Sequence, residues 1–95
     1  MFLILLALAL LINQAGPDHI IIPAINLSQP VYPVGLRDLG KGRFIWETLP
    51  DDVGWHYQSS TPGEGSNIVL NGHSNIMGRV FKDLYRLRVG DQISV

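Results

Sequence analysis

The residues of this chain best suited to acid–base chemistry are its three histidines, His19, His56 and His73. An imidazole titrates near neutral pH, so it can both give and take a proton during a reaction. His73 has the most favourable context, because it follows an apolar run at residues 67–71 and a glycine that lets the backbone turn. A side chain at a strand end is held firmly and stays open to substrate. This context favours His73 as a general acid or base, although a lone histidine is more often structural and that alternative stays open.

The other two histidines have weaker contexts. His19 lies at the edge of a linker, where we expect it to be solvated, and His56 follows Trp55, where we expect it to pack or to form a structural hydrogen bond. No histidine has a second ligand at a spacing typical of metal sites, and the chain contains no cysteine. We therefore expect no metal site, no cofactor, no disulfide and no thiol nucleophile within these 95 residues.

Two glycine-rich stretches match ligand-binding loops only in part. Residues 35–42 approach the pattern of a phosphate-binding P-loop, but Gly42 stands where the hydroxyl group of a serine or threonine would bind magnesium. Such a loop should also lead into a helix whose first amides face the phosphates, whereas residues 43–46 have a strand-like sequence. We therefore expect a flexible polar loop rather than a nucleotide site. Residues 63–66 precede a strand and predict a turn.

Length and charge limit the classes of protein to which this chain can belong. The 95 residues allow one small domain, and the formal net charge of -1 comes from 7 basic and 8 acidic residues without any charged block. The aromatic residues are not interleaved with basic ones. The composition therefore indicates no nucleic-acid partner.

The chain begins with an uninterrupted apolar run, residues 1–12. As a helix this run would reach about 18 Å, whereas the core of a bilayer is about 30 Å thick. A signal peptide would begin with basic residues, and the first basic residue of this chain is Arg37. We favour a membrane anchor whose beginning is missing, which places the rest of the chain outside the cytoplasm. A weak signal-peptide core and a buried core helix are the alternatives. Residues 13–18 predict a linker.

The region from residue 19 to residue 95 begins with patterns typical of short strands. Pro23 should end a strand at residues 20–22. A second extended run, residues 31–34, contains one proline and follows another, which confines it to an edge or to irregular pairing. A third strand is predicted at residues 43–46, and the apolar run at residues 67–71 predicts a central strand buried on both faces.

The last part of the chain adds the single helix of the prediction. Apolar residues at helical spacing predict a short helix over residues 78–87. Gly90 and Asp91 predict a tight turn, and a further strand should start near Ile93. The predicted fold class is therefore all-β with a short helix.

Several sequence blocks, in their order along the chain, resemble the sortase family. These blocks are Ile22-Pro23-Ala24-Ile25 with Pro30-Val31-Tyr32, Val53-Gly54-Trp55-His56 with Pro62-Gly63-Glu64, Asn67-Ile-Val-Leu-Asn-Gly-His73, and a pattern that contains Gly78, Val80, Phe81, Leu84, Leu87, Gly90, Asp91, Ile93 and Val95. Each block alone has low specificity. Their order and spacing cover nearly all of the chain from His19 onward, and the apolar residues 1–12 correspond to the membrane anchor that is usual in the family.

The resemblance implies a fold and a reaction. Sortases are extracytoplasmic cysteine transpeptidases built on a β-barrel, so the resemblance implies a barrel domain over residues 19–95, held at the cell membrane by one N-terminal anchor. In the family a thiolate attacks a sorting signal of the Leu-Pro-x-Thr-Gly type, and an amine of the cell wall or of a pilin resolves the acyl-enzyme. By resemblance His73 is the catalytic histidine, which protonates the leaving amine and deprotonates the incoming one.

The sequence also departs from the family pattern. The cysteine and the arginine of the family lie on later strands, which would fall beyond Val95. We therefore expect about the first half of a barrel, an inactive fragment with open strand edges that folds poorly. A non-catalytic, membrane-anchored sortase-like remnant is the main alternative. A generic β-domain with a chance resemblance is the third, since it requires every ordered block to coincide.

Overall fold

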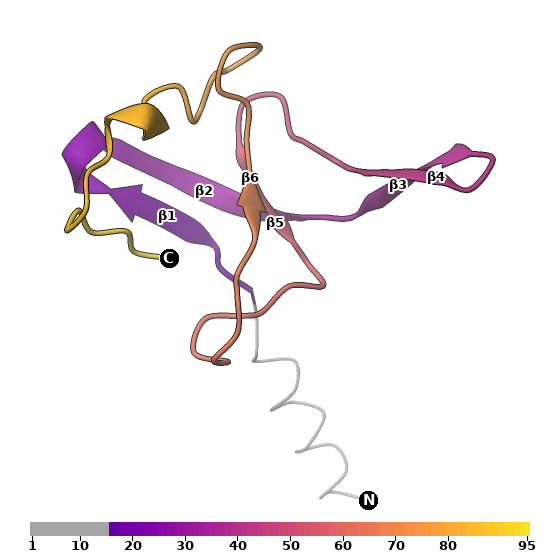
Figure 1. Ribbon diagram of the computed structural model, residues 1–95, viewed down its shortest axis with the longest axis horizontal. Coiled ribbons are helices and arrows are strands. Elements are labelled where there is room, and N and C mark those ends of the chain that lie inside the picture. Colours follow the sequence, from indigo (N-terminus) through magenta and orange to yellow (C-terminus); the bar gives the residue numbers. More distant parts are fainter. Residues whose placement is uncertain (1–15) are drawn as a thin grey trace, which may run out of the picture.

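The structure is a computed structural model that describes residues 16–95 (Figure 1). The predicted membrane anchor at residues 1–12 and the first half of the predicted linker, residues 13–15, lie outside the described residues. Within residues 16–95, no helix has both the length and the apolar character needed to cross a bilayer.

Four strands form the main sheet, in the order β1-β2-β5-β6. Their bounds are β1 His19–Ile22, β2 Leu27–Val34, β5 Val53–His56 and β6 Leu70–Asn71. The pairings of β1 with β2 and of β5 with β6 are antiparallel, and β2 runs parallel to β5. Over residues 16–95 this sheet is open rather than closed into a barrel, which agrees with the expectation of an incomplete one.

The long strand β2 changes partner along its length. Residues Leu27 to Pro30 pair with β1, whereas Val31 to Val34 pair with β5. Beyond Val31, whose amide donates to the Asp18 carbonyl oxygen at 2.9 Å, β2 therefore has a strand partner on one side only. This arrangement confirms the irregular pairing that the prolines predicted, because proline offers no amide hydrogen to a second neighbour.

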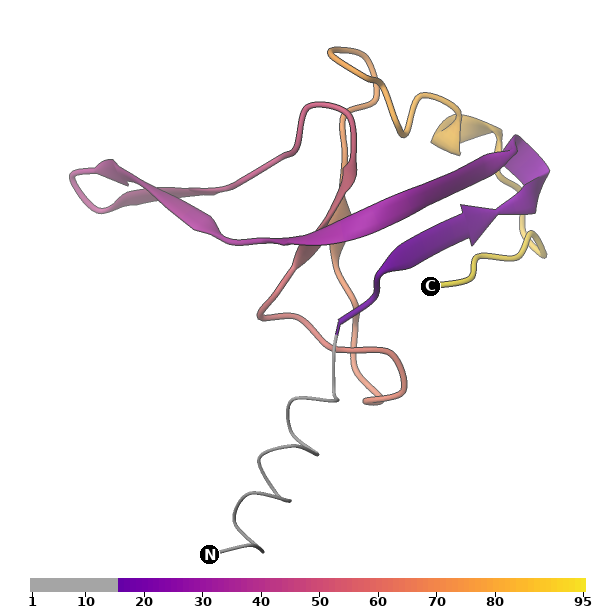
Figure 2. The same cartoon turned by 180° about the vertical axis from the view of Figure 1, so that it is seen from behind.

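Two further strands form a separate hairpin. β3 (Leu36–Gly40) pairs antiparallel with β4 (Arg43–Trp46), and the hairpin extends away from the main sheet in both views (Figures 1 and 2). Its turn runs through Gly40, Lys41 and Gly42, all at positive φ, and the Gly40 amide donates to the Asp38 carboxylate at 2.7 Å. The strand at residues 43–46 is confirmed. The polar loop predicted at residues 35–42 is wrong, because its residues pair with β4 instead.

The core lies on one side of the main sheet. β1 alternates exposed and buried residues, and β2 and β5 supply the facing apolar side chains. The buried cluster consists of Ile20, Ile22, Leu27, Val31, Val53 and Phe81. Pro23 ends β1 as predicted, since a one-turn 3-10 helix, η1 (Pro23–Ile25), follows directly. Asn26 then reverses the chain in the left-handed conformation, with a φ of 52°.

The C-terminal third covers this core without forming the predicted α-helix. Residues 78–87 consist of turns and a 3-10 helix, η2 (Leu84–Arg86). The helix prediction is therefore wrong. Met77 and Arg79 have φ values of 53° and 52°, and a right-handed helix cannot include that conformation. The apolar spacing reflected burial of Phe81 instead, which is only 8% exposed.

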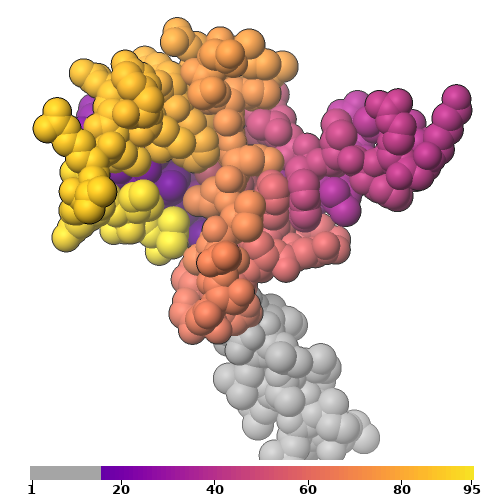
Figure 3. All heavy atoms as spheres, viewed as in Figure 1, coloured from indigo at the N-terminus to yellow at the C-terminus, as the bar shows by residue number. Residues whose placement is uncertain are grey.

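The end of the chain returns to β1. Ile21 and Ser94 exchange two backbone hydrogen bonds of 2.9 Å, so the strand predicted near Ile93 is present as a single antiparallel bridge. In the space-filling view the C-terminal residues, in yellow, cover much of the indigo segment (Figure 3). The tight turn is also confirmed, with Gly90 at a φ of 99° and the Asp91 amide bonded to the Arg88 carbonyl oxygen.

The predicted central strand at residues 67–71 is shorter and lies elsewhere in the sheet. Only Leu70 and Asn71 pair, and they form the last strand in the sheet order rather than a central one. Both residues are half-buried. The prediction failed because a compact apolar run does not specify how many neighbours its strand will find.

Candidate active site

His73 is fixed by its backbone next to the core. It follows β6 after Gly72, and its carbonyl oxygen accepts a hydrogen bond of 2.9 Å from the Phe81 amide. Gly72 is closely packed, since a Cβ atom there would lie 2.7 Å from a methyl carbon of Val80 and 2.8 Å from the Phe81 ring. The sequence predicted that this glycine lets the backbone turn. In the structure it also lets the chain pass close to the core.

The His73 side chain is half-buried. Its ring forms no hydrogen bond with another residue of the described range, 16–95. An imidazole in this situation keeps one donor and one acceptor nitrogen for other groups. Such a ring can donate a proton to a bound molecule or accept one from it.

A polar cluster lies just upstream of His73, around the His56 ring on β5. The ring stacks on Trp46 with centroids 3.9 Å apart and planes 9° from parallel. Its Nε2 atom lies 3.0 Å from the side-chain nitrogen of Asn71, which also donates to the Glu47 carbonyl oxygen at 2.8 Å. Burial lowers the pKa of His56 below its ordinary value. The prediction that His56 packs and forms a structural hydrogen bond is confirmed.

His19 does not belong to this cluster and has a different environment. It is exposed, and its Nε2 atom lies 2.9 Å from the Ser28 hydroxyl oxygen on the neighbouring strand. The solvated position expected for His19 is confirmed, and the side chain serves as a cross-strand contact.

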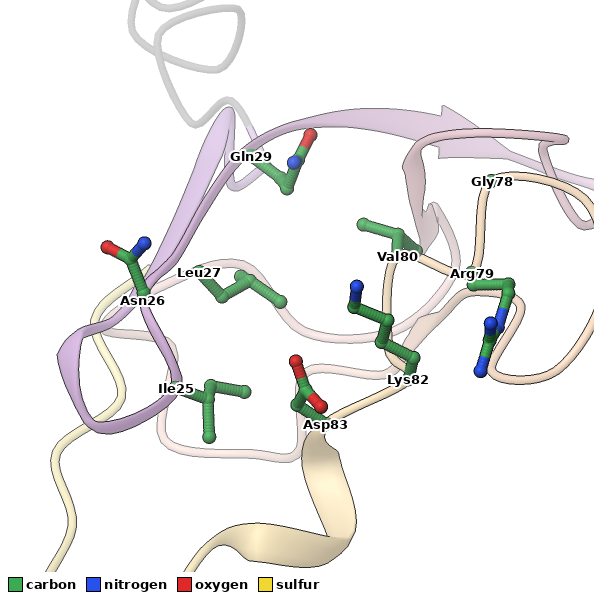
Figure 4. Close-up of a pocket in the computed structure, with 9 residues that line it drawn as sticks. All are labelled: Ile25, Asn26, Leu27, Gln29, Gly78, Arg79, Val80, Lys82 and Asp83. Atoms are coloured by element: carbon green, nitrogen blue, oxygen red, sulfur yellow. The ribbon is translucent and has the colours of Figure 1, made fainter.

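A hollow in the described surface lies beside the segment that follows His73 (Figure 4). Its volume is about 250 Å³, and it separates the η1–β2 corner from residues 78–83. The lining residues are Ile25, Asn26, Leu27, Gln29, Gly78, Arg79, Val80, Lys82 and Asp83. His73 is not among them, so this hollow is not the site of the predicted acid–base residue. Among the described residues, no three His, Asp or Glu side chains gather closely enough to hold a metal ion.

A comparison with protein-family models decides the family. The model of the sortase domain matches residues 20–95, which is most of the chain. This chain belongs to the sortase family. The match confirms the resemblance drawn from the ordered sequence blocks and agrees with the mostly β structure. Comparisons with curated proteins and with solved structures found no match.

The sequence of this sortase did not predict that Trp46 and Asn71 contact the His56 ring. Both belong to segments whose pairing is set by the tertiary structure, since Trp46 ends β4 and Asn71 ends β6. The one local signal was the position of Asn71, a polar residue that ends an apolar run two residues before His73. A polar residue in such a run commonly has a hydrogen-bond partner elsewhere in the fold.

The loop that leads this sortase chain from β5 to β6 is held by one carboxylate. Glu64 accepts hydrogen bonds from the Ser60 hydroxyl at 2.6 Å, the Thr61 hydroxyl at 3.0 Å and the Thr61 amide at 3.4 Å. Gly63 and Gly65, on either side, both have a φ of 85°. The turn predicted at residues 63–66 is confirmed.

This loop should loosen in acid. The hydrogen bond from Ser60, followed by those from Thr61, holds the pKa of Glu64 below its ordinary value of 4.5. The folded chain therefore binds the proton less readily than the unfolded chain, so the stabilisation is present above pH 4.5 and is lost as the pH falls through the lowered pKa. We expect an NMR titration to move the Thr61 amide resonance with a midpoint below 4.5, and Glu64→Gln to abolish that transition. A midpoint at or above 4.5 would contradict the prediction.

Proposed function

We propose that His73 is the catalytic histidine of a sortase reaction in which a sorting signal of the Leu-Pro-x-Thr-Gly type is cleaved and the surface protein is joined to an amine of the cell wall or of a pilin. The family match over residues 20–95 supports the class of reaction. The observation that carries the residue assignment is the anchored His73 backbone, bonded to the core residue Phe81, beside a ring with no hydrogen bond to another described residue.

In this proposal His73 moves protons between the two amines. A cysteine thiolate attacks the threonine carbonyl carbon, a thioester forms, and the Thr–Gly bond breaks while His73 gives its proton to the departing glycine amine. The acceptor amine then attacks the thioester, a new amide bond forms, and His73 takes the proton that the attacking nitrogen loses. The thiolate leaves and is ready for another cycle. Because these 95 residues contain no cysteine, the proposal assigns the nucleophile to residues outside them.

A second candidate is a membrane-anchored sortase-like remnant that has no catalytic activity. Both candidates share a proposed location. The apolar run at residues 1–12 would form part of a single N-terminal membrane anchor, with the sortase region on the extracytoplasmic side. The two candidates differ in whether a thiol reaches His73.

The test is a transfer assay on the complete reading frame that contains these residues. The protein is incubated with a fluorogenic Leu-Pro-x-Thr-Gly peptide, with and without an added glycine oligomer as the acceptor amine. The products are identified by mass spectrometry. We expect a ligated product that requires the amine and disappears after thiol alkylation. Cleavage that persists after alkylation would refute the thiol mechanism. A peptide that stays intact would refute the catalytic proposal and support the non-catalytic remnant. The 95-residue polypeptide alone should not cleave the peptide.

A further inference from the structure

We propose that Asn71 and His56 form a positioning pair that fixes the chain just before His73, and that the pair requires a neutral His56 ring with its proton on Nδ1. The structural part of this proposal concerns the contacts around Asn71. Its effect on catalysis rests on the proposed function of His73.

The arrangement follows from the hydrogens of one amide group. The side-chain nitrogen of Asn71 carries two hydrogens and has two neighbours, the Glu47 carbonyl oxygen at 2.8 Å and the His56 Nε2 atom at 3.0 Å. The carbonyl oxygen can only accept, so it takes one hydrogen. The second hydrogen points to Nε2, which must then offer its lone pair. A neutral imidazole with an unprotonated Nε2 carries its hydrogen on Nδ1.

The opposite orientation of the Asn71 amide is unfavourable. Turning the group over would place Oδ1 against the Glu47 carbonyl oxygen, and two acceptors would then face each other without a hydrogen between them. In the observed orientation Oδ1 is buried and has no hydrogen-bond partner among the described residues. An unpaired buried acceptor is unfavourable. The two N–H contacts are what an asparagine provides here that an apolar residue would not.

The pair connects three segments that are distant in sequence. Glu47 follows β4, His56 ends β5 and Asn71 ends β6. Trp46 adds a third contact by stacking on the face of the His56 ring, which fixes the plane of the ring and the direction of Nε2. On β5 the residue opposite Asn71 is Gly54, and a Cβ atom there would lie 2.7 Å from Asn71 Oδ1. The Asn71 side chain is therefore held between the Glu47 carbonyl oxygen, the His56 ring and Gly54.

Asn71 is separated from His73 by one residue, Gly72. Downstream, the His73 carbonyl oxygen is bonded to the Phe81 amide, and Gly72 lies against Val80 and Phe81. Upstream, the Val69 carbonyl oxygen accepts from the His56 amide at 2.9 Å, and the Val69 amide donates to the Ser59 hydroxyl at 3.0 Å. The paired residues Leu70 and Asn71 follow, and the Asn71 side chain adds the last tie before Gly72 and His73. The side-chain pair therefore restrains the end of β6 together with the backbone hydrogen bonds.

The surroundings of His56 favour its neutral form. Burial lowers the pKa of the ring and so favours the uncharged form, in which one ring nitrogen has no hydrogen. The Asn71 amide hydrogen directed at Nε2 then selects the tautomer with its hydrogen on Nδ1. The titratable side chains on neighbouring residues are Glu47 and Tyr57. The Glu47 carboxylate lies 3.4 Å from the Gly35 amide, and the Tyr57 hydroxyl accepts from Gln58 at 3.2 Å. Neither is hydrogen-bonded to the ring.

The structural part is tested on the wild-type complete protein, labelled with ¹⁵N in histidine. Long-range proton–nitrogen correlation spectra at neutral pH distinguish the two tautomers of each ring. We expect His56 to carry its hydrogen on Nδ1, with an unprotonated Nε2. A His56 ring that is protonated on Nε2, or that exchanges between tautomers as a free imidazole does, would overturn the proposal whatever the protein catalyses.

The positioning effect is tested with matched variants of His56. His56→Phe keeps a ring to stack on Trp46 but removes the acceptor, whereas His56→Gln supplies a side-chain oxygen that can accept the Asn71 hydrogen. We expect His56→Phe to lower kcat for peptide transfer by about tenfold to a hundredfold with little change in KM, as expected for a small displacement of a catalytic group. His56→Gln should restore most of that loss. Equal activity of the two variants, or a change in KM alone, would refute the positioning role.

The same variants separate this inference from the proposed function. The ring resonances of His73 should be single and sharp in the wild type and in His56→Gln, and broadened or split in His56→Phe, even if no peptide is cleaved. The predicted His56 tautomer together with an inert protein would leave the positioning pair standing while the catalytic proposal falls.

Discussion

Replacing His73 with glutamine is expected to lower kcat/KM for peptide transfer by about 10²- to 10⁴-fold, the range over which a positioned general acid–base group contributes. Glutamine keeps polarity and approximate volume but cannot carry a proton between the leaving and incoming amines. The backbone bond from the Phe81 amide to the residue 73 carbonyl oxygen does not depend on the side chain, so the local fold should survive. The measurement is peptide transfer by the complete protein, with thermal unfolding followed in parallel.

The control for this variant is His19→Gln. His19 is exposed, and its ring contacts the Ser28 hydroxyl across β1 and β2, so its replacement should leave peptide transfer unchanged. If His73→Gln retained full activity, His73 would not be the acid–base residue. If it lowered the unfolding temperature as strongly as a core substitution, the histidine would have the structural role that its isolation in the sequence left open.

Replacing Ile22 with alanine is expected to destabilise the fold by about 2–5 kcal/mol, as for other fully buried isoleucines. Ile22 is only 1% exposed and lies opposite Leu27 at the corner where β1 turns into β2. A single small core contains it, together with Val53 and Phe81. Small domains are stable by only about 5–15 kcal/mol, so this one change removes a large share of the total. The free energy of unfolding is measured by urea denaturation of the complete protein.

The neighbouring residue provides a matched control. Ile21 is 43% exposed, and its bridge to Ser94 is made by backbone atoms that an alanine retains. Ile21→Ala should therefore change the free energy of unfolding by at most about 0.5 kcal/mol. Similar losses for the two alanine variants would mean that the core is not on the side of β1 assigned to it. A loss confined to Ile21→Ala would mean that the register of β1 is shifted by one residue.

Some of this fold could be read directly from local sequence. The β-branched run at residues 20–22 and the proline after it are sufficient to predict a strand and its end, because both act through the backbone of adjacent residues. The turns at Gly63 and Gly90 are local in the same sense, since glycine adopts a positive φ without steric strain. The position of His73 after a strand was also correct, and the ordered sequence blocks around it are sufficient to identify the sortase family. Its catalytic role stays a prediction.

Other features depended on contacts between distant segments. The apolar residues at helical spacing over residues 78–87 do not form a helix; they lie in turns that place Phe81 in the core. The periodicity could not predict this, because it carries no information on the positive φ of Met77 and Arg79. Residues 36–40, which belong to the predicted polar loop, form a strand because β4 pairs with them. Trp46, His56 and Asn71 come together from three strands, and no local sequence pattern around any of them predicts its contact with the others. The sequence by itself determined which residues favour extended or turning backbone, and which histidine follows a strand. Only the tertiary structure decided which strands pair and which polar groups meet, because hydrogen bonding between distant segments depends on their arrangement in space.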